Sequence, residues 1–187
     1  AAKECELITD FYVSSDDEKI LSAAEEVGYK RIVRPAELAS PTAQHVDAIV
    51  HALGVMKDDG CEPDILVVLL ANNAITKTEW IRESIMNLID NPGLSASCPV
   101  MLELDRHPYR SKRLREDGCL DTWFDFHGRQ ISTNRQDLPL NYVLCHNFWS
   151  LRLLNSIYGK EEGQAPWRFM GNYVKPVIVK ESSDVHY

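Results

Sequence analysis

Short apolar runs alternate along the chain with segments whose apolar residues recur at helical spacing. The most apolar run covers residues 64–70, and its aliphatic, β-branched composition predicts a central strand buried on both faces. Further strands are predicted at residues 11–13, 31–33, 98–104, 142–149 and 174–179, and helices at residues 20–27, 42–57, 81–89 and 151–158. Regular alternation of this kind predicts an α/β fold with a doubly wound, mostly parallel sheet.

Residues 105–140 break this alternation. They hold a basic cluster at residues 106–115, followed by the aromatic side chains of Trp123, Phe124 and Phe126. Such a segment predicts an arm that projects from the sheet and whose aromatic residues need a surface to cover them. We therefore expect a single domain over residues 1–187 with the arm inserted at residues 105–140.

The composition of the chain disfavours several classes of binding partner and one class of metal site. The formal net charge of −8 over 187 residues argues against a nucleic-acid partner or an anionic membrane, and no apolar run is long enough to span a bilayer. The five cysteines are scattered and none forms a CxxC pair, which disfavours a zinc site built on thiolates. Reduced thiols in a cytoplasmic protein are the expected state.

Three groups of polar residues are candidates for chemistry. Asn72 and Asn73 follow the aliphatic strand, where α/β sheets bind ligands, although such residues also end strands and cap helices. Arg135 offers a planar fork for a carboxylate or phosphate, and Gln136 adds a donor and an acceptor; a surface turn is the alternative. Asp184 and His186 lie two apart, so on a strand both could face a divalent cation or simply form polar surface.

Several strings together resemble the acylneuraminate cytidylyltransferase family, the CMP-sugar synthetases. They are Val-Ser-Ser-Asp-Asp at residues 13–17, Arg-Pro-Ala-Glu-Leu-Ala at residues 34–39, Asn-Arg-Gln-Asp-Leu-Pro at residues 134–139 and Ser-Asp-Val at residues 183–185. They occur in the family's order and spread over nearly the whole chain. The second and third strings are specific in combination, whereas neither would be so alone.

The resemblance implies a Rossmann-like nucleotide-binding domain whose arm, residues 105–140, forms a homodimer. It implies an enzyme, a nucleotidyltransferase that moves CMP from CTP to a sialic-acid-like nonulosonic acid with Mg²⁺ and releases pyrophosphate. By matching position, Arg34 would help hold the nucleotide. Asn72 and Asn73 stand where the family commonly has a Gln-Pro-Thr-Ser-Pro-Leu-Arg-like turn; the usual Gln and Arg are absent, and the two amides could still hydrogen-bond a base or sugar. The sugar side would be Arg135, Gln136 and Tyr142, with Arg135 and Asp184 catalytic and Asp184 and His186 near the metal.

The chain also departs from this family. The family's Gly/Ser/Lys-rich loop around the triphosphate has no counterpart in residues 1–187, and the chain begins without Met, so we expect the loop upstream in a longer protein. Loss of that first unit would remove a central strand and leave the neighbouring strands with unpaired edges. His186 stands where a second metal-binding Asp is usual, and Cys145 where an Asn is common. The alternative is a non-catalytic dimeric protein that binds sugar nucleotides or another partner.

Overall fold

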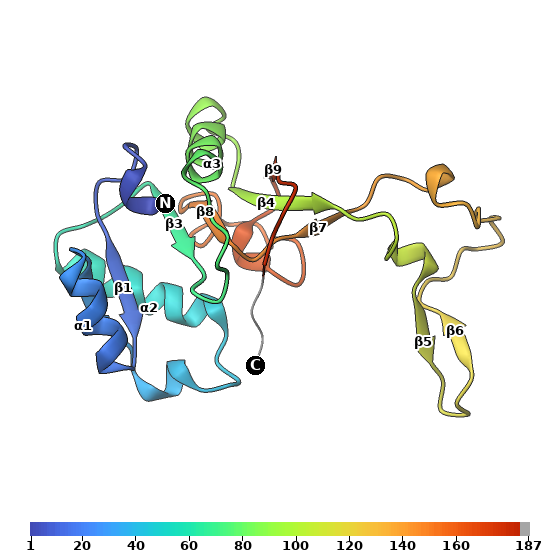
Figure 1. Ribbon diagram of the computed structural model, residues 1–187, viewed down its shortest axis with the longest axis horizontal. Coiled ribbons are helices and arrows are strands. Elements are labelled where there is room, and N and C mark those ends of the chain that lie inside the picture. Colours follow the sequence, from blue (N-terminus) through green and yellow to red (C-terminus); the bar gives the residue numbers. More distant parts are fainter. Residues whose placement is uncertain (184–187) are drawn as a thin grey trace.

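The computed structural model describes residues 1–183 of the chain, which form an α/β body and a projecting arm (Figure 1). The helices are α1 (Glu18–Glu26), α2 (His45–Asp58) and α3 (Thr78–Asp90). The strands of the body are β1 (Tyr12–Ser15), β2 (Lys30–Val33), β3 (Ile65–Leu69), β4 (Ala96–Leu102), β7 (Tyr142–Leu144), β8 (Phe148–Arg152) and β9 (Val174–Ile178). Among the described residues, no helix is both long and apolar enough to cross a membrane.

The body contains a two-stranded and a five-stranded sheet. β1 pairs with β2 in parallel. β3 and β4 both run antiparallel to β8, which lies between them, and β9 runs parallel to β4. β3, β4 and β9 therefore share one direction, while β7 and β8 run opposite. The expected α/β class with a Rossmann-like arrangement is confirmed, and its reversed strands are β7 and β8.

Helices cover both faces of β3, as its continuous apolar run predicted. Leu66 and Val68 pack in a cluster with Ile49, Leu53 and Met56 of α2. On the other face, Ile65 and Val67 pack with Ile81 and Ile85 of α3 and with the N-terminal segment around Ala2. Because alternate side chains point to opposite faces of a strand, every position in β3 must be apolar.

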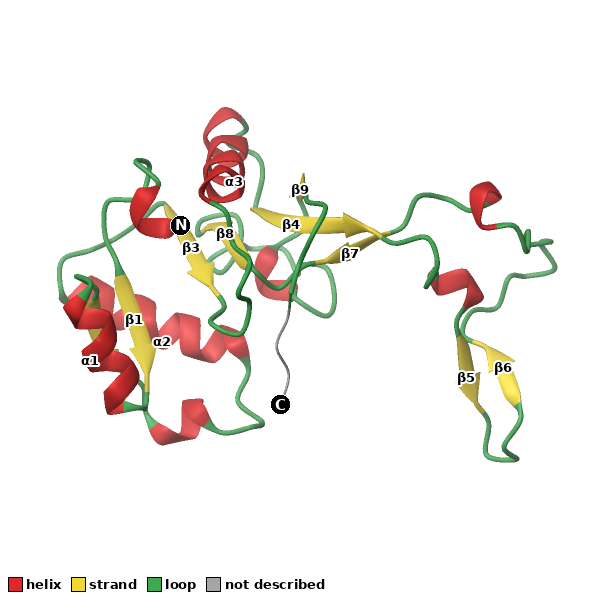
Figure 2. Cartoon of the chain, in the orientation of Figure 1, coloured by secondary structure: helices red, strands yellow, loops and turns green. Residues whose placement is uncertain are grey.

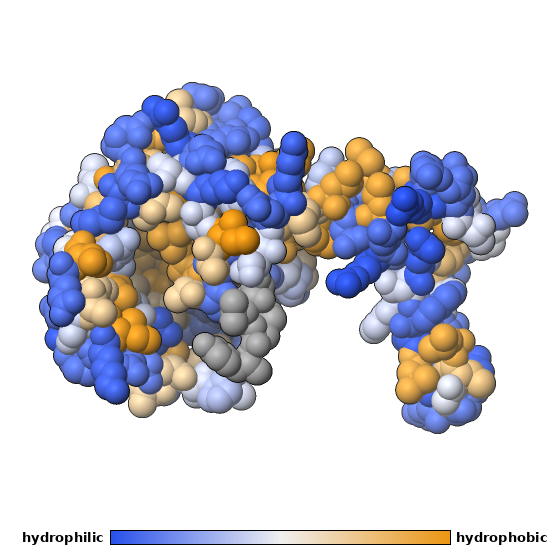
Figure 3. Space-filling model, viewed as in Figure 1, coloured by the Kyte–Doolittle hydropathy of each residue, from blue (hydrophilic) through white to orange (hydrophobic). Residues whose placement is uncertain are grey.

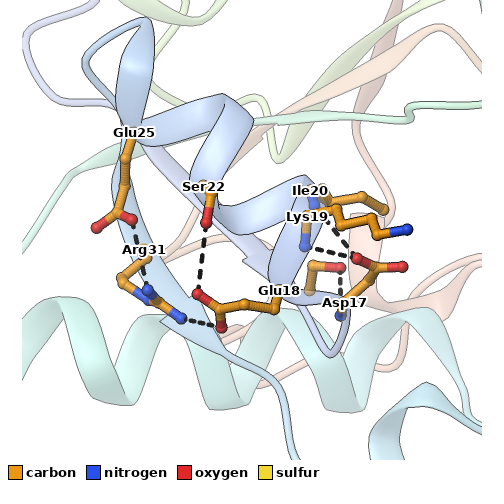
Figure 4. A network of polar contacts seen from close by, with 8 residues as sticks. Asp17, Glu18, Lys19, Ile20, Ser22, Glu25 and Arg31 are labelled. Carbon is orange, nitrogen blue, oxygen red and sulfur yellow. Dashed lines mark hydrogen bonds and ion pairs between the residues drawn. The ribbon is translucent and has the colours of Figure 1, made fainter.

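Helix α1 begins at a side-chain cap. The Asp17 carboxylate accepts from the backbone N–H groups of Lys19 (2.7 Å) and Ile20 (3.3 Å), which have no partner within the helix (Figure 4). On the exposed side, Arg31 of β2 pairs with Glu18 (2.6 Å) and Glu25 (3.4 Å) of α1. The serine and aspartate string at residues 13–17 thus ends a strand and starts a helix.

The arm leaves the body between β4 and β7. It carries the hairpin of β5 (Lys112–Leu114) and β6 (Leu120–Thr122), which lies far from β1 and the helices (Figure 1). The rings of Tyr109, Phe124 and Phe126 pack against one another, with centroids 5.4 to 6.4 Å apart. At the hairpin, Leu114 and Leu120 are 73% and 69% exposed.

Two sequence-based expectations near the C-terminal half are wrong in detail. The strand expected at residues 142–149 is two strands, β7 and β8, which meet β4 one after the other and are interrupted at residues 145–147. The helix expected at residues 151–158 is instead the end of β8 followed by turns. The apolar spacing there serves strand pairing, because Leu151 lies opposite both Leu66 and Ala96.

A cavity of about 930 Å³ separates the two sheets. It is lined by Tyr12, Val13 and Ser14 of β1 on one side and by all of β3 on the other. Figure 3 shows this part of the body as a hollow with apolar walls. In the described residues, the edges of β1 and β3 that border this cavity pair with no strand.

Candidate functional site

The carboxyl ends of strands β1, β2 and β3 carry the residues expected to bind the nucleotide. β1 and β3 point toward the same edge of the body (Figure 2). The segment after β2 brings Arg34 to this edge, and the segment after β3 brings Asn72 and Asn73 there. Ligands of α/β proteins bind beyond the carboxyl ends of strands, so these residues are in the expected place.

Arg34 is held by Ser14 at the end of β1. Its Nε donates to Ser14 Oγ (3.1 Å) and its Nη2 to the Ser14 carbonyl oxygen (2.5 Å). Arg34 also lines the cavity between the sheets. A guanidinium has five N–H donors, so a fork oriented by two bonds can still present donors to a phosphate.

Asn73 belongs to an internal amide network. Its Nδ2 donates to Ser182 Oγ (3.2 Å), and its Oδ1 accepts from Asn147 Nδ2 (2.8 Å) and from the backbone of Ile75 (3.1 Å). Ser182 Oγ in turn donates to Asn147 Oδ1 (3.2 Å). These bonds anchor the segment after β3 to the segment after β9, which is the structural alternative for this residue. Asn72 beside it is exposed.

Arg135 lies in the arm, in the short 3-10 helix Arg135–Asp137, and its guanidinium pairs with Asp105. Gln136 next to it is exposed, and Tyr142 at the start of β7 is 43% exposed. The arm extends away from β1 and β3, so one chain does not bring these residues to Arg34 (Figure 1). Within one protomer, the predicted nucleotide residues and sugar residues therefore form two separate groups.

The expected metal residues Asp184 and His186 lie outside the described residues. Within residues 1–183, no group of three or more His, Cys, Asp or Glu side chains is placed to hold a metal ion. An aspartate carboxylate suits Mg²⁺, which commonly takes one or two protein carboxylates together with water and substrate phosphates. Asp184 has the right donor chemistry, whereas an imidazole such as that of His186 suits softer metals.

Cys145 is buried at the interruption between β7 and β8, with its thiol 3.9 Å from the Val143 carbonyl oxygen. Burial raises the pKa of this thiol. Burial also raises the pKa of Cys98, on neighbouring β4, to about 12. Both side chains are therefore neutral at physiological pH, and neither has the thiolate character of a nucleophile.

A polar cluster of Tyr12, Lys30 and Asp59 lines the opposite end of the cavity. The Tyr12 hydroxyl donates to Asp59 (3.0 Å), and Lys30 Nζ donates to the Tyr12 oxygen (3.1 Å) and lies 3.3 Å from Asp59. The hydrogen bond from Tyr12 lowers the pKa of the Asp59 carboxyl, and Lys30 adds to this effect. The cluster ties the β1–β2 pair to the end of α2, and so fixes the width of the cavity at this end.

Sequence reasoning did not identify Asn147 and Trp149 as residues of interest. Asn147 is fully buried, and a polar residue amid the apolar positions after Cys145 was the available signal. Trp149 lines the cavity, and its indole Nε1 is a buried donor for which the described residues supply no acceptor. Buried donors without a partner are exceptions in folded proteins.

Comparison with known proteins shows a likeness in structure, whereas the sequence comparisons find none. No protein-family model matches the chain, and no curated protein matches it. A solved structure of CMP:2-keto-3-deoxy-manno-octonic acid synthetase complexed with CTP is similar, with a TM-score of 0.64 and 15% sequence identity. The likeness covers 98% of this chain and 78% of that chain. Over 98% of its length, this chain shares the fold of that synthetase.

Proposed function

We propose that this chain is part of a cytidylyltransferase that transfers CMP from CTP to a sialic-acid-like nonulosonic acid and releases pyrophosphate. The observation that carries the proposal is the likeness in fold, over 98% of the chain, to a synthetase solved with CTP. The strings at residues 34–39 and 134–139 support the same reaction class independently, because they are sequence features and the likeness is structural.

In this proposal the nucleotide lies at the carboxyl ends of β1 to β3. Arg34, oriented by its bonds to Ser14, donates to a phosphate, and the exposed amide of Asn72 faces the base or ribose. The anomeric hydroxyl of the sugar acid attacks the α-phosphate, and pyrophosphate leaves. Positioned cations stabilise the charge that develops on the phosphate oxygens.

The sugar side is supplied by a second copy of the chain. Arg135, Gln136 and Tyr142 lie on the arm or at its base, away from Arg34 of the same chain, and the hairpin exposes Leu114 and Leu120. A homodimer in which each arm reaches the other body would bring the two groups together and cover this apolar surface. The guanidinium of Arg135 would then exchange Asp105 for the sugar carboxylate.

Mg²⁺ is part of the proposal. The carboxylate of Asp184 would hold the ion near the phosphates, and His186 would lie next to the metal site. When bound, the ion neutralises phosphate charge. The five free cysteines fit a protein of the cytoplasm, where thiols stay reduced.

A second candidate function is binding without catalysis. One observation favours it: the amide of Asn73, which was expected at the nucleotide, is engaged within the protein. Such a protein would bind a sugar nucleotide as a dimer and leave it unchanged. The two candidates therefore differ in whether the protein holds the triphosphate of CTP so that it reacts.

Pyrophosphate release tests both. The chain, alone and within any longer protein that contains it, is incubated with CTP, Mg²⁺ and in turn sialic, legionaminic, pseudaminic or Kdo-type acids. Release that depends on all three components supports the enzyme. CTP or CMP-sugar binding by calorimetry without release supports the second candidate, and the absence of both binding and release contradicts the two together.

Substitution of Arg135 examines the sugar side. We expect Arg135→Ala to lower turnover by more than about a hundredfold if Arg135 clamps the sugar carboxylate. It should change the free energy of unfolding by less than about 1 kcal/mol, because the pair with Asp105 is exposed. Arg129→Ala, at another exposed arginine of the arm, is the matched control and should leave turnover unchanged. Unfolding of the Arg135 variant would show a structural role instead.

A further inference from the structure

Two strand edges face each other across the cavity without pairing. In the described part of the chain, β1 pairs only with β2 and β3 pairs only with β8, so each has one edge that no strand covers. The cavity of about 930 Å³ lies between these two edges and is lined by residues along both. Uncovered edges inside a protein body are unusual, because they leave rows of backbone donors and acceptors unsatisfied.

The strand registers identify the backbone groups on these edges. The Asp64 carbonyl oxygen accepts from the N–H of Leu153, and the N–H of Leu70 donates to the Asn147 carbonyl oxygen. The alternation of an antiparallel pair therefore turns the N–H and C=O groups of Ile65, Val67 and Leu69 away from β8. These groups face the cavity. On β1, the carbonyl oxygens of Phe11 and Ser15 accept from the N–H groups of Lys30 in β2 and of Arg34 just after it. The N–H and C=O groups of Tyr12 and Ser14 therefore turn away from β2 and face the cavity from the other side.

The Ser14 carbonyl oxygen, one of the acceptors on the open edge of β1, has a side-chain donor as its partner. It accepts from the side chain of Arg34, where a neighbouring strand would normally donate. β1 and β3 also point in the same direction (Figure 2), so a single strand between them could run parallel to both.

The walls of the cavity define the side chains that would fit. One face is formed by Ala48, Ile49, Ala52 and Met56 of α2, and the other by Leu7 and Ile8 with Ile85 and Ile89 of α3. Both faces are apolar, so a strand in this position must be apolar at every residue, as β3 is. The hollow with apolar walls is visible in Figure 3.

From these edges and walls we propose that the cavity is a binding slot for one extended aliphatic polypeptide strand supplied from outside residues 1–187. The strand pairs with β1 on one side and β3 on the other, and so joins the two sheets into one. Its affinity comes from main-chain hydrogen bonds along two edges and from burial of aliphatic side chains on both faces. This proposal does not depend on cytidylyl transfer.

A second copy of the chain is a poor occupant. The aliphatic strand β3 is bonded to β8 and covered on both faces by helices, so it cannot enter another body without unfolding its own. A compact small molecule would leave most of the edge groups unpaired, since β3 alone spans about 17 Å. An extended peptide satisfies both edges along their length.

The probe is a labelled synthetic peptide with a run of about five Val and Ile residues between terminal lysines. Its binding to the 187-residue chain is followed by fluorescence anisotropy and by amide hydrogen exchange. We expect exchange to slow by more than about tenfold at Ile65, Val67 and Leu69 and at Tyr12 and Ser14. Leu66 and Val68, already bonded to β8, should change much less. A peptide with Asp at alternate positions should not bind.

Two variants, each aimed at one part of the slot, test its location. Val67→Pro removes a donor that faces the slot while keeping the bonds from β3 to β8, and should weaken peptide binding by about tenfold or more. Ala52→Trp fills the slot from α2 and should do the same. Val50→Trp, on the exposed side of α2, is the matched control and should bind the peptide as the unmodified chain does.

A fusion keeps the test decisive if the isolated chain or a variant folds poorly. The aliphatic peptide is joined to Ala1 through a Gly/Ser linker, and the Tm of this fusion should exceed that of the same fusion with Asp at alternate positions. Equal Tm values would overturn the proposal. So would equal binding of both peptides, protection confined to other segments, or protection of both edges by self-association of the chain without peptide.

Discussion

Asn147 illustrates how a single buried polar residue organises the candidate site. Its amide joins Asn73, Ile75 and Ser182, and thereby fixes two segments that leave the sheet at the same edge. A buried amide that lost these partners would destabilise the fold, because its desolvation would no longer be offset by hydrogen bonds. Asn147 therefore positions the segment after β3, which also carries Asn72.

The cysteines give a prediction at the residue scale. In native protein at neutral to alkaline pH, we expect the exposed thiol of Cys119 to react with a thiol reagent. Cys98 should stay unreactive throughout this range, because burial raises its pKa to about 12. Mass spectrometry after labelling identifies the modified residues, and labelling in guanidinium chloride, where all five react, is the control.

The raised pKa of Cys98 determines how its contribution to the free energy of unfolding changes with pH. Between the ordinary thiol pKa and about 12, the unfolded chain loses a proton from Cys98 that the folded chain retains. The contribution of Cys98 to stability is therefore intact below the ordinary pKa and declines as pH rises above it. Rapid labelling of native Cys98 at pH 8 to 9, at the rate seen for Cys119, would contradict the burial of this strand.

At the scale of single elements, local sequence chemistry and structure agree best at the start of α1. The serine and aspartate residues before the helix indicated a cap, and Asp17 makes it. Agreement is poorer at residues 151–158, where apolar spacing suggested a helix but pairing of β8 with β3 and β4 formed a strand. Capping depends on neighbours in sequence, whereas strand pairing depends on residues far away.

Removal of this cap gives a prediction for α1. Asp17→Ala should lower the free energy of unfolding by about 1 kcal/mol, because two backbone N–H groups lose their acceptor. Urea denaturation measures the change. Asp16→Ala, at the exposed neighbour that makes no cap bond, is the control and should cost less than about 0.5 kcal/mol. Equal losses in both variants would argue against the cap.

For the whole molecule, the main feature is the separation of an α/β body from a projecting arm. The arm was predicted from a break in the strand and helix alternation, and its hairpin extends well beyond the body (Figure 1). Its exposed leucines and packed aromatic rings have the composition of a surface that becomes covered. Its role in dimerisation is a prediction.

Charge placed on the hairpin tests the dimer. The double substitution Leu114→Asp and Leu120→Asp should shift the protein toward monomer, because dimerisation would then bury charged carboxylates at the contact and remove their water. Light scattering coupled to gel filtration measures the mass. Leu154→Asp, at a side chain of the body that is 75% exposed, is the matched control and should not change the mass. A monomeric unmodified protein, or a dimer that survives the hairpin substitutions, would contradict the prediction.

The sequence by itself determined the α/β class, the buried character of residues 64–70, the position of the arm and the cap of α1, because these depend on local periodicity and composition. Only the tertiary structure decided that β8 runs between β3 and β4, that Asn73 is held by Asn147, and that Arg34 and Arg135 of one chain lie apart. It also showed that the open edges of β1 and β3 border one cavity. Contacts between distant segments carry no local signal, so their arrangement appears only when the chain is folded.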